Sequence, residues 1–465
     1  MKKSRFLTLV VIAIILTAAL PIQAQDAPVR IRWFVGLGAG TDAPVIPAQE
    51  ALVAEFNASQ TEIELVLEIV DNDQAYDVLS TQIAAGNAPD IVGPMGIRGR
   101  SSYPGAWLDL QPLIDATGYD MTDFDPALVD FYRIEGEGQL GIPFAVFPSF
   151  LLYNRALFDE ADLPYPPTAY GEPYIDWEGN ERAWDMDTIR ELAMILTVDV
   201  NGNDATMEEF DPDNIVAFGF GNQFTDFRGR STLFGAGNVV DADGNAIIPE
   251  TWREAAHWYH DAMWVDYFYP NGVYGNSDLL GGTGGNWFGT GNIAMILIHS
   301  WFLGWGTADL DAAWDFAPVP AYEGVTTAKL HADTFGIMNT TQYPEEAFTV
   351  LTYLLGDRAE ELNQLYGGMP ARLSLQGGFF DRYTEQLAES YPNVDWANLN
   401  WDVPVASLGY PDNPNHEEGM PSFLETTARY TEFVQLVDNN PDVDIDAELD
   451  QLIVDMQAIF DAASQ

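Results

Sequence analysis

The 465-residue sequence predicts an α/β fold divided into two lobes. Apolar residues at 63, 65, 67 and 69 alternate mainly with glutamates, which is typical of a strand with one exposed face. A helical pattern follows through Tyr76, Leu79 and Ile83, and residues 90–93 indicate a short buried strand. Since a single core rarely grows beyond about 250–300 residues, a chain of this length is expected to form two lobes.

The segments before this unit extend the same alternation. Residues 29–35 predict a first strand, and a helix is expected over residues 48–57. Between them lies the glycine-rich turn 36–40, which lacks the glycine spacing of a dinucleotide loop and is interpreted as a flexible cleft wall. Ligands of such sheets bind at the carboxyl ends of the strands, so the turn after Val92 is a candidate binding position.

The remaining elements are expected at regular intervals along the chain. Extended apolar or proline-containing segments suit strands that cross between lobes, and these fall at 141–154, 315–320 and 367–372. Asp185 is expected to cap a helix through Leu196. Strands are predicted at 218–222, 293–298 and 330–338, a hairpin at 239–248, and helices at 344–355 and 449–460.

The N-terminal residues predict export. Residues 1–5 are basic, residues 6–20 are apolar, and residues 21–24 supply a helix break and a small residue, so residues 1–24 are expected to be a cleaved signal peptide. The chain has no cysteine, which excludes lipid attachment through an N-terminal cysteine. We therefore expect a soluble protein in the periplasm or outside the cell, without a lipid anchor.

The charge of the chain excludes several classes of partner. The formal net charge is −52, so nucleic acid and anionic membrane surfaces would be repelled. The acidic residues are spread along the whole sequence, which favours a solvated surface over a dedicated cation site.

Four segments together resemble a known family. They are the run 76–91, which ends in Gly86-Asn87-Ala88-Pro89-Asp90-Ile91, and the segments 141–154, 292–301 and 316–320. In this order they resemble the extracellular solute-binding proteins of ABC importers, of the maltose-binding, carbohydrate type (family 1). The resemblance implies a type II periplasmic-binding fold, in which crossing hinge strands join two lobes around a ligand cleft.

The resemblance also implies how the chain is divided and what it does. Residues 25–145 with 316–366 are expected to form lobe 1, and residues 146–315 with 367–465 lobe 2. The chain would capture a sugar or oligosaccharide by lobe closure and deliver it to the permease subunits of an ABC transporter. It would act as a monomer, without a cofactor and without catalysing a reaction.

Nine residues are candidates for ligand contact, because sugars are bound by aromatic faces and planar polar groups. Trp301 follows a buried strand, where the family commonly has a cleft aromatic, although a core-filling role is equally open. Asp333 is an isolated acid among apolar residues. The other candidates come from strand ends, crossings or expected cleft edges, and for each a core or solvated role is the alternative: Met95, Arg98, Phe144, Asn222, Phe224, Arg372 and Tyr410.

Other readings of the sequence stay open at this stage. A cationic solute such as a polyamine would need several acids converging with aromatics in the cleft. A secreted carbohydrate-active hydrolase would need two carboxylates at a set separation, which sequence cannot measure. Asp199, Asn201 and Asn203 begin like a calcium loop, but the glycine and terminal glutamate are missing, so a turn is expected. His257 and His260 lack a third ligand, and no metal site is predicted.

Overall fold

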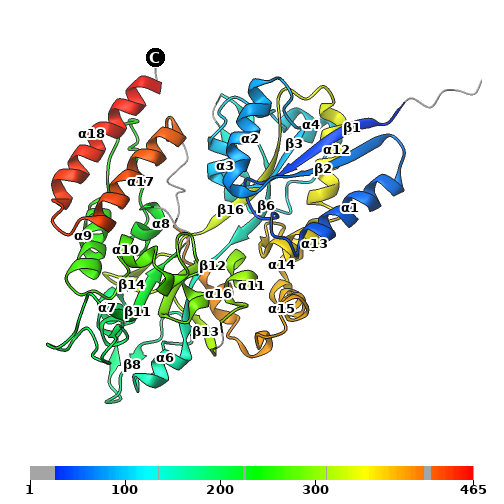
Figure 1. Cartoon of the computed structure of the whole chain (residues 1–465). Helices are drawn as coiled ribbons and strands as arrows, with labels where there is room; N and C mark the ends of the chain where they lie inside the picture. The colour runs from blue at the N-terminus through cyan, green and yellow to red at the C-terminus, as the bar shows by residue number, and fades with distance from the viewer. Residues whose placement is uncertain (1–26, 135, 224–226, 311, 413–419, 464–465) are drawn as a thin grey trace, which may run out of the picture.

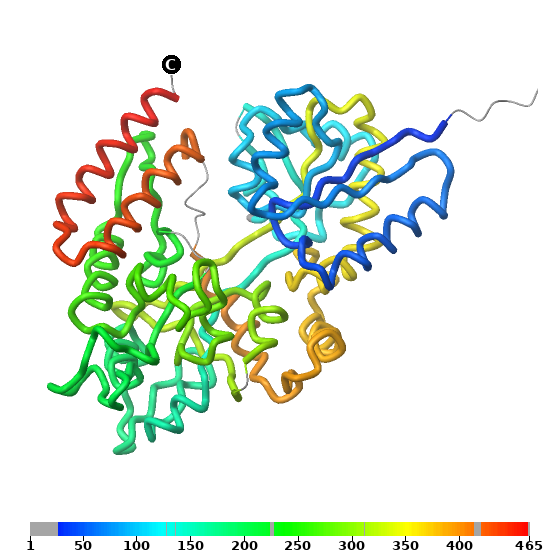
Figure 2. The backbone as a smooth tube through the Cα atoms, in the orientation of Figure 1, coloured from blue at the N-terminus to red at the C-terminus, as the bar shows by residue number. Residues whose placement is uncertain are grey.

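The structure is a computed structural model that describes residues 27–134, 136–223, 227–310, 312–412 and 420–463. The chain forms two lobes, each built on its own sheet (Figures 1 and 2). The expected signal peptide, residues 1–24, lies outside the described residues. Within the described part of the chain, no helix is both long and apolar enough to cross a bilayer.

The first lobe contains a six-stranded sheet of mixed direction. β1 pairs in parallel with β2 and β3, whereas β16, β6 and β17 add antiparallel strands beyond β3. The strands, in spatial order, are β17 (Met369–Pro370), β6 (Ile142–Phe147), β16 (His331–Ile337), β3 (Ile91–Met95), β1 (Val29–Val35) and β2 (Ile63–Ile69).

Both faces of this sheet are covered by helices, as β1 illustrates. Ile31, Trp33 and Val35 pack on one side with α1, α12 and α13, while Phe34 packs on the other with α2. This two-sided burial explains why β1 ends in the continuous apolar run Trp33–Val35, whereas its first half alternates with Arg30 and Arg32. The helices of this lobe are α1 (Ile46–Ser59), α2 (Asn72–Ala84), α3 (Ile97–Ser101), α4 (Gln111–Thr117), α5 (Pro126–Phe131), α12 (Pro344–Leu355) and α13 (Ala359–Tyr366).

The second lobe contains a five-stranded sheet with its own core. Its strands, in spatial order, are β10 (Val198–Asp199), β11 (Ile215–Asn222), β12 (Ile293–His299), β7 (Ser149–Asn154) and β13 (Trp314–Ala317). Its longer helices are α6 (Arg155–Glu160), α7 (Met186–Ile195), α9 (Glu250–Trp264), α15 (Phe379–Ser390), α16 (Asp402–Ser407), α17 (Phe423–Asn439) and α18 (Ile445–Ala463). Asp185 caps α7 as expected, because its side chain accepts a hydrogen bond from the Thr188 N–H at 3.0 Å.

Short elements complete the chain. The two-residue strands are β4 (Arg133–Ile134), β5 (Gly138–Gln139), β8 (Tyr174–Ile175), β9 (Glu181–Arg182), β14 (Ala321–Tyr322) and β15 (Val325–Thr326). The short helices are α8 (Phe227–Ser231), α10 (Gly272–Gly275), α11 (Leu303–Thr307) and α14 (Leu373–Gln376), and the 3₁₀ turns are η1 (Thr232–Phe234), η2 (Asp278–Leu280), η3 (Phe288–Thr290), η4 (Ser300–Phe302) and η5 (Trp396–Asn398). The hairpin expected at 239–248 is reduced to one bridge between Val240 and Ala246.

The chain passes between the lobes along strands at their junction (Figure 2). β6 belongs to the six-stranded sheet and β7 to the five-stranded one, so the 141–154 segment crosses at Pro148 as expected. The return runs from β13 to β16. Residues 367–372, expected as a third crossing, instead include the edge strand β17 paired with β6, so the chain leaves this sheet only afterwards.

The predicted lobe limits fall close to these strands. The limit after residue 145 lies within β6, the limit before residue 316 lies within β13, and the limit before residue 367 directly precedes β17. The exact division of the chain between lobes therefore stays a prediction.

Candidate functional site

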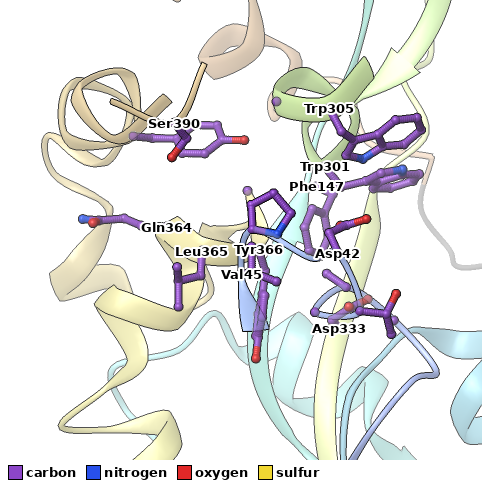
Figure 3. A pocket seen from close by; sticks show the side chains of 18 of the residues that line it. Asp42, Val45, Phe147, Trp301, Trp305, Asp333, Gln364, Leu365, Tyr366 and Ser390 are labelled. Atoms are coloured by element: carbon purple, nitrogen blue, oxygen red, sulfur yellow. The ribbon is translucent and has the colours of Figure 1, made fainter. Parts of the chain in front are cut away.

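A cavity of about 540 Å³ lies at the junction of the two lobes (Figure 3). One wall comes from the six-stranded lobe, through the turn 37–45, β16 and the end of α13. The opposite wall comes from η4, α11 and α15, which pack on the five-stranded lobe. Because both lobes contribute, a change in their separation would change the size of this cavity.

Aromatic rings dominate the cavity wall. Their ring faces provide the apolar surface on which a sugar ring or an alkylammonium group can rest. The aromatic lining residues are Phe147, Trp301, Trp305, Tyr366, Tyr383 and Tyr391.

Trp301 is held by neighbouring rings. Its indole stacks on His299 with centroids 4.3 Å apart and an interplanar angle of 16°, while His331 and Phe147 meet it edge-on at 5.0 and 5.6 Å. Trp301 follows β12 in the 3₁₀ turn η4 and is half-buried. Its orientation is therefore fixed by contacts from β12, β16 and β6 before a ligand arrives.

Asp333 is the buried acid of the cavity. It lies on β16 with 6% of its surface exposed, and no hydrogen bond from a described residue reaches its carboxylate. Burial raises the pKa of Asp333 to about 7. Gly38 and Gly96, which also line the cavity, lie close to the carboxylate of Asp333. A Cβ atom at Gly38 would lie 3.1 Å from one carboxylate oxygen, and a Cβ atom at Gly96 would lie 3.2 Å from the other.

The turn after β1 forms the rim beside this acid. Asn72 holds the turn closed by donating to the carbonyls of Gly36 and Gly38 at 3.0 and 2.9 Å. Asp42 is exposed at the rim, and its negative charge adds to burial in raising the pKa of Tyr391 on the opposite wall. The glycine-rich turn 36–40 thus forms part of the cavity wall, as the sequence indicated.

Two buried side-chain atoms in the wall have no hydrogen-bond partner among the described residues. Nε2 of His331 and Oε1 of Gln386 are buried without a hydrogen bond. Burial and the nearby Lys329 hold the pKa of His331 well below its usual range, so its ring is neutral around pH 7. In contrast, the Tyr366 hydroxyl is already used, because it donates to Oε1 of Gln49 at 2.8 Å. The cavity therefore presents both unused polar atoms and a satisfied, rigid ring.

Of the nine candidate ligand residues, the structure brings Trp301 and Asp333 together in this cavity. Phe144 lies one layer behind it, with its ring 5.0 Å from Phe335 and 6.0 Å from the lining residue Tyr366. Met95 is fully buried in the core of the six-stranded lobe.

The other candidates lie away from the cavity or outside the described residues. Asn222 is buried at the end of β11 and donates to the Tyr259 hydroxyl at 3.0 Å. Phe224 lies outside the described residues. The remaining three contact protein groups: Arg98 lies over the ring of Tyr76, Arg372 pairs with Asp123, and Tyr410 stacks on Tyr170.

Several parts of the wall were not among the sequence candidates: the rim residues 41–45, Phe147, α11 with Trp305, His331, the end of α13 at 364–367, and α15 with Tyr391. The polar rim followed the glycine-rich turn and offered a weak signal. The apolar stripe of α15 is equally typical of a core helix, so the sequence of α15 gave no indication of a binding site.

The suspected metal positions resolve into turns and surface contacts. Oδ1 of Asp199 accepts the backbone N–H groups of Asn201 and Asn203 at 2.7 and 2.9 Å, and Oδ2 accepts that of Asp211 at 2.9 Å. His257 contacts Asp446 across to α18. Among the described residues, no group of three or more His, Cys, Asp or Glu side chains is arranged to hold a metal ion.

Two α/β lobes joined by crossing strands around an aromatic cavity define a bilobed binding protein. The model of the bacterial extracellular solute-binding protein family matches residues 43–361, and the chain belongs to that family. It is a family of binding proteins rather than enzymes. No curated protein sequence matches the chain.

Solved structures of similar fold cover almost the whole chain. An ABC substrate-binding protein from Listeria monocytogenes in complex with cycloalternan is 18% identical, with a TM-score of 0.69 over 93% of this chain and 98% of that one. The cyclic α-maltosyl-1,6-maltose binding protein from Arthrobacter globiformis is 19% identical, with a TM-score of 0.66 over 94% and 100%. UgpB from Mycobacterium tuberculosis in complex with glycerophosphocholine is 15% identical, with a TM-score of 0.67 over 95% and 100%. These likenesses establish the fold.

Proposed function

We propose that this protein captures a carbohydrate in the inter-lobe cavity and delivers it to an ABC transporter. The observation that carries the proposal is the cavity wall, which combines Trp301 and five other aromatic residues with Asp333, an acceptor to which no described residue donates. Sugars have apolar ring faces and hydroxyl edges, so they match aromatic faces combined with carboxylate and amide acceptors. Two similar structures support this assignment: one holds cycloalternan, and the other is named as a cyclic α-maltosyl-1,6-maltose binding protein.

Capture would proceed by closure of the lobes. The turn 37–45 and β16 would contact one side of the ligand, while Trp301 and α15 would contact the other. A ligand that contacts both lobes favours the closed state over the open one, which is sufficient to drive closure without chemistry. The crossings at Pro148 and between β13 and β16 are the positions at which the lobes can rotate.

The wider setting follows from the same assignment. The protein would be exported by the signal peptide at residues 1–24 and would remain soluble in the periplasm or outside the cell. It would act as a monomer without a cofactor, bind its ligand without turnover and dock on permease subunits. The ligand contacts would include the two candidates that line the cavity.

A panel of mono- and oligosaccharides tests this proposal. Binding of the right sugar should raise the thermal midpoint, because a ligand stabilises the state that binds it. Small-angle scattering of the same sample should show compaction, and chromatography should recover the sugar unchanged. A panel that leaves the midpoint unmoved would refute the carbohydrate assignment, and release of new reducing ends would refute binding without turnover.

A further inference from the structure

The carboxylate of Asp333 is buried in the cavity wall without a hydrogen-bond donor. Only 6% of the residue is exposed, and the described residues supply it with no N–H or O–H group. Its position is set by β16, where it pairs in register with Ala145 of β6, and by the close approach of Gly38 and Gly96. Buried carboxylates usually receive donors from the protein, so the donors that complete this site are expected to come from the ligand.

The lining residues that the structure describes also provide no lysine or arginine beside this acid. Asp42 instead adds a second acid at the rim. Lys329 and Arg228 are buried outside the lining, and both act on the pKa of Asp412 and on that of the lining residue His331. Arg98 lies over the ring of Tyr76 at 4.5 Å.

The titratable groups around Asp333 do not offset its burial. The negative charge of Asp333 adds to burial in raising the pKa values of Tyr76 and Tyr132. Arg100 lies over Phe131 and lowers the pKa of Tyr132 rather than pairing with the acid. His331, two residues before it on β16, is held neutral, so burial alone accounts for the raised pKa of Asp333.

We propose that Asp333 selects the ligand by charge: it accepts hydrogen bonds from a neutral or amino-bearing carbohydrate and excludes sugar acids and sugar phosphates. This inference rests on the proposed carbohydrate function of the cavity. A carboxylate can accept from two donors at once, such as neighbouring hydroxyls or an ammonium group. An anionic ligand would place a second negative charge beside Asp333 in a cavity whose described lining has no lysine or arginine, and like charges disfavour each other strongly when buried.

Binding should then be linked to release of a proton. A ligand hydroxyl or ammonium donates to the ionised carboxylate, and Asp333 is partly protonated near neutral pH because burial raises its pKa to about 7. The ligand therefore displaces that proton into the buffer, and affinity should fall as the pH is lowered below neutral. A structural acid with no ligand contact would release no proton on binding.

Matched sugar triplets provide the test. Each triplet shares one ring configuration and differs in charge: glucose, glucosamine and glucuronic acid, then galactose, galactosamine and galacturonic acid, as monomers and as short 1,4-linked oligomers. Calorimetry at pH 8 with the wild-type protein should give at least about tenfold tighter binding of the neutral or amino member than of the acid. In Asp333→Asn this preference should fall to about twofold or less, because the amide keeps the shape of the side chain without its charge.

Proton release is measured with the sugar that binds, in two buffers of different ionisation enthalpy at pH 7. The wild type should release about half a proton per sugar, given a pKa of about 7. Asp333→Asn should release none, and Asp73→Asn, which removes an exposed acid of α2 outside the cavity, should behave as the wild type. Wild-type measurements alone decide the matter if the Asp333 variant does not fold.

The outcomes separate the two proposals. If the wild type binds the acid member as tightly as the others, or releases no proton, charge selection by Asp333 is refuted while the carbohydrate function stands. Retained discrimination in Asp333→Asn would equally refute it. If no sugar of any triplet binds, the carbohydrate function itself fails.

Discussion

Replacing Asp333 by asparagine should stabilise the ligand-free protein by an amount that depends on pH. The carboxylate is buried without a partner, and its pKa is raised from 3.8 to about 7 by burial. Asparagine has nearly the same shape but cannot ionise, so the variant lacks the cost of a buried unpaired charge. The wild type and the variant should therefore differ in stability at every pH at which Asp333 is ionised in the folded or in the unfolded chain.

The sign and size follow from the two protonation equilibria. Because the folded-state pKa lies above the unfolded value of 3.8, the folded protein holds the extra proton between pH 3.8 and about 7. Wild-type stability relative to the variant is thus greatest below pH 3.8 and falls as the pH rises through 7. At about 1.4 kcal/mol per pKa unit, the variant should be more stable by about 2 kcal/mol at pH 5 and by about 4 kcal/mol at pH 8.

Urea unfolding followed by tryptophan fluorescence measures this difference at pH 4, 5, 6, 7 and 8. The comparison of two variants at each pH removes the effect of the many other acids in the chain, because these are common to both proteins. Asp73→Asn supplies the control for loss of one surface charge. The reasoning is refuted if the stability difference stays constant across this pH range, or if Asp333→Asn is the less stable protein at pH 8.

Three further outcomes are expected. Trp301→Ala should weaken binding of the sugar by about tenfold or more in calorimetry, whereas Trp177→Ala, which removes a ring 53% exposed in the β8–β9 loop, should leave the affinity unchanged. Arg230→Met should lower the free energy of unfolding by about 3 kcal/mol, because Asp438 would lose its bidentate ion pair with Arg230, whose two hydrogen bonds are 2.8 and 3.2 Å long. The double variant Arg230→Met with Asp438→Leu should recover part of this loss of stability. Calcium chloride should not change the thermal midpoint, since the Asp199 carboxylate already accepts hydrogen bonds from backbone N–H groups. A calcium-dependent rise in the midpoint would contradict this interpretation. Asp199→Ala should lower the midpoint, because the turn would lose these hydrogen bonds.

Much of the fold could be predicted because its elements are specified locally. Residues 29–35 form β1 within the expected limits, and residues 344–355 form α12, because apolar runs, prolines and polar flanks mark both ends. The crossing at 141–154 was also visible, since Pro148 separates the apolar segment into two strands, although Pro143 is accommodated within β6. By contrast, residues 367–372 include a strand that pairs with β6, more than 200 residues earlier in the chain. A local sequence pattern cannot predict a pairing over that distance.

The site was predictable only where chemistry and position coincided. Trp301 follows a strand and Asp333 interrupts an apolar one, so both departed from what a core requires. Arg372 was an equally plausible candidate from the sequence. In the structure its guanidinium pairs with Asp123 and donates to the carbonyl of Leu355, and these contacts between distant segments form only in the folded chain. The opposite cavity wall, which includes Tyr391 after α15, could not be predicted from the sequence. Tyr391 reaches the cavity because it packs against Gly304 of α11, and this contact depends on tertiary packing.

The unpaired state of Asp333 connects stability to binding. A buried carboxylate without a donor destabilises the empty protein most at high pH, where it is always ionised. A sugar that donates to it removes that cost, so the increase in unfolding free energy on adding saturating sugar should be larger at pH 8 than at pH 5. Asp333→Asn should abolish this difference between the two pH values while retaining some binding through Trp301. If the sugar stabilises the wild type equally at both, the ligand does not reach Asp333 and the acid has another role.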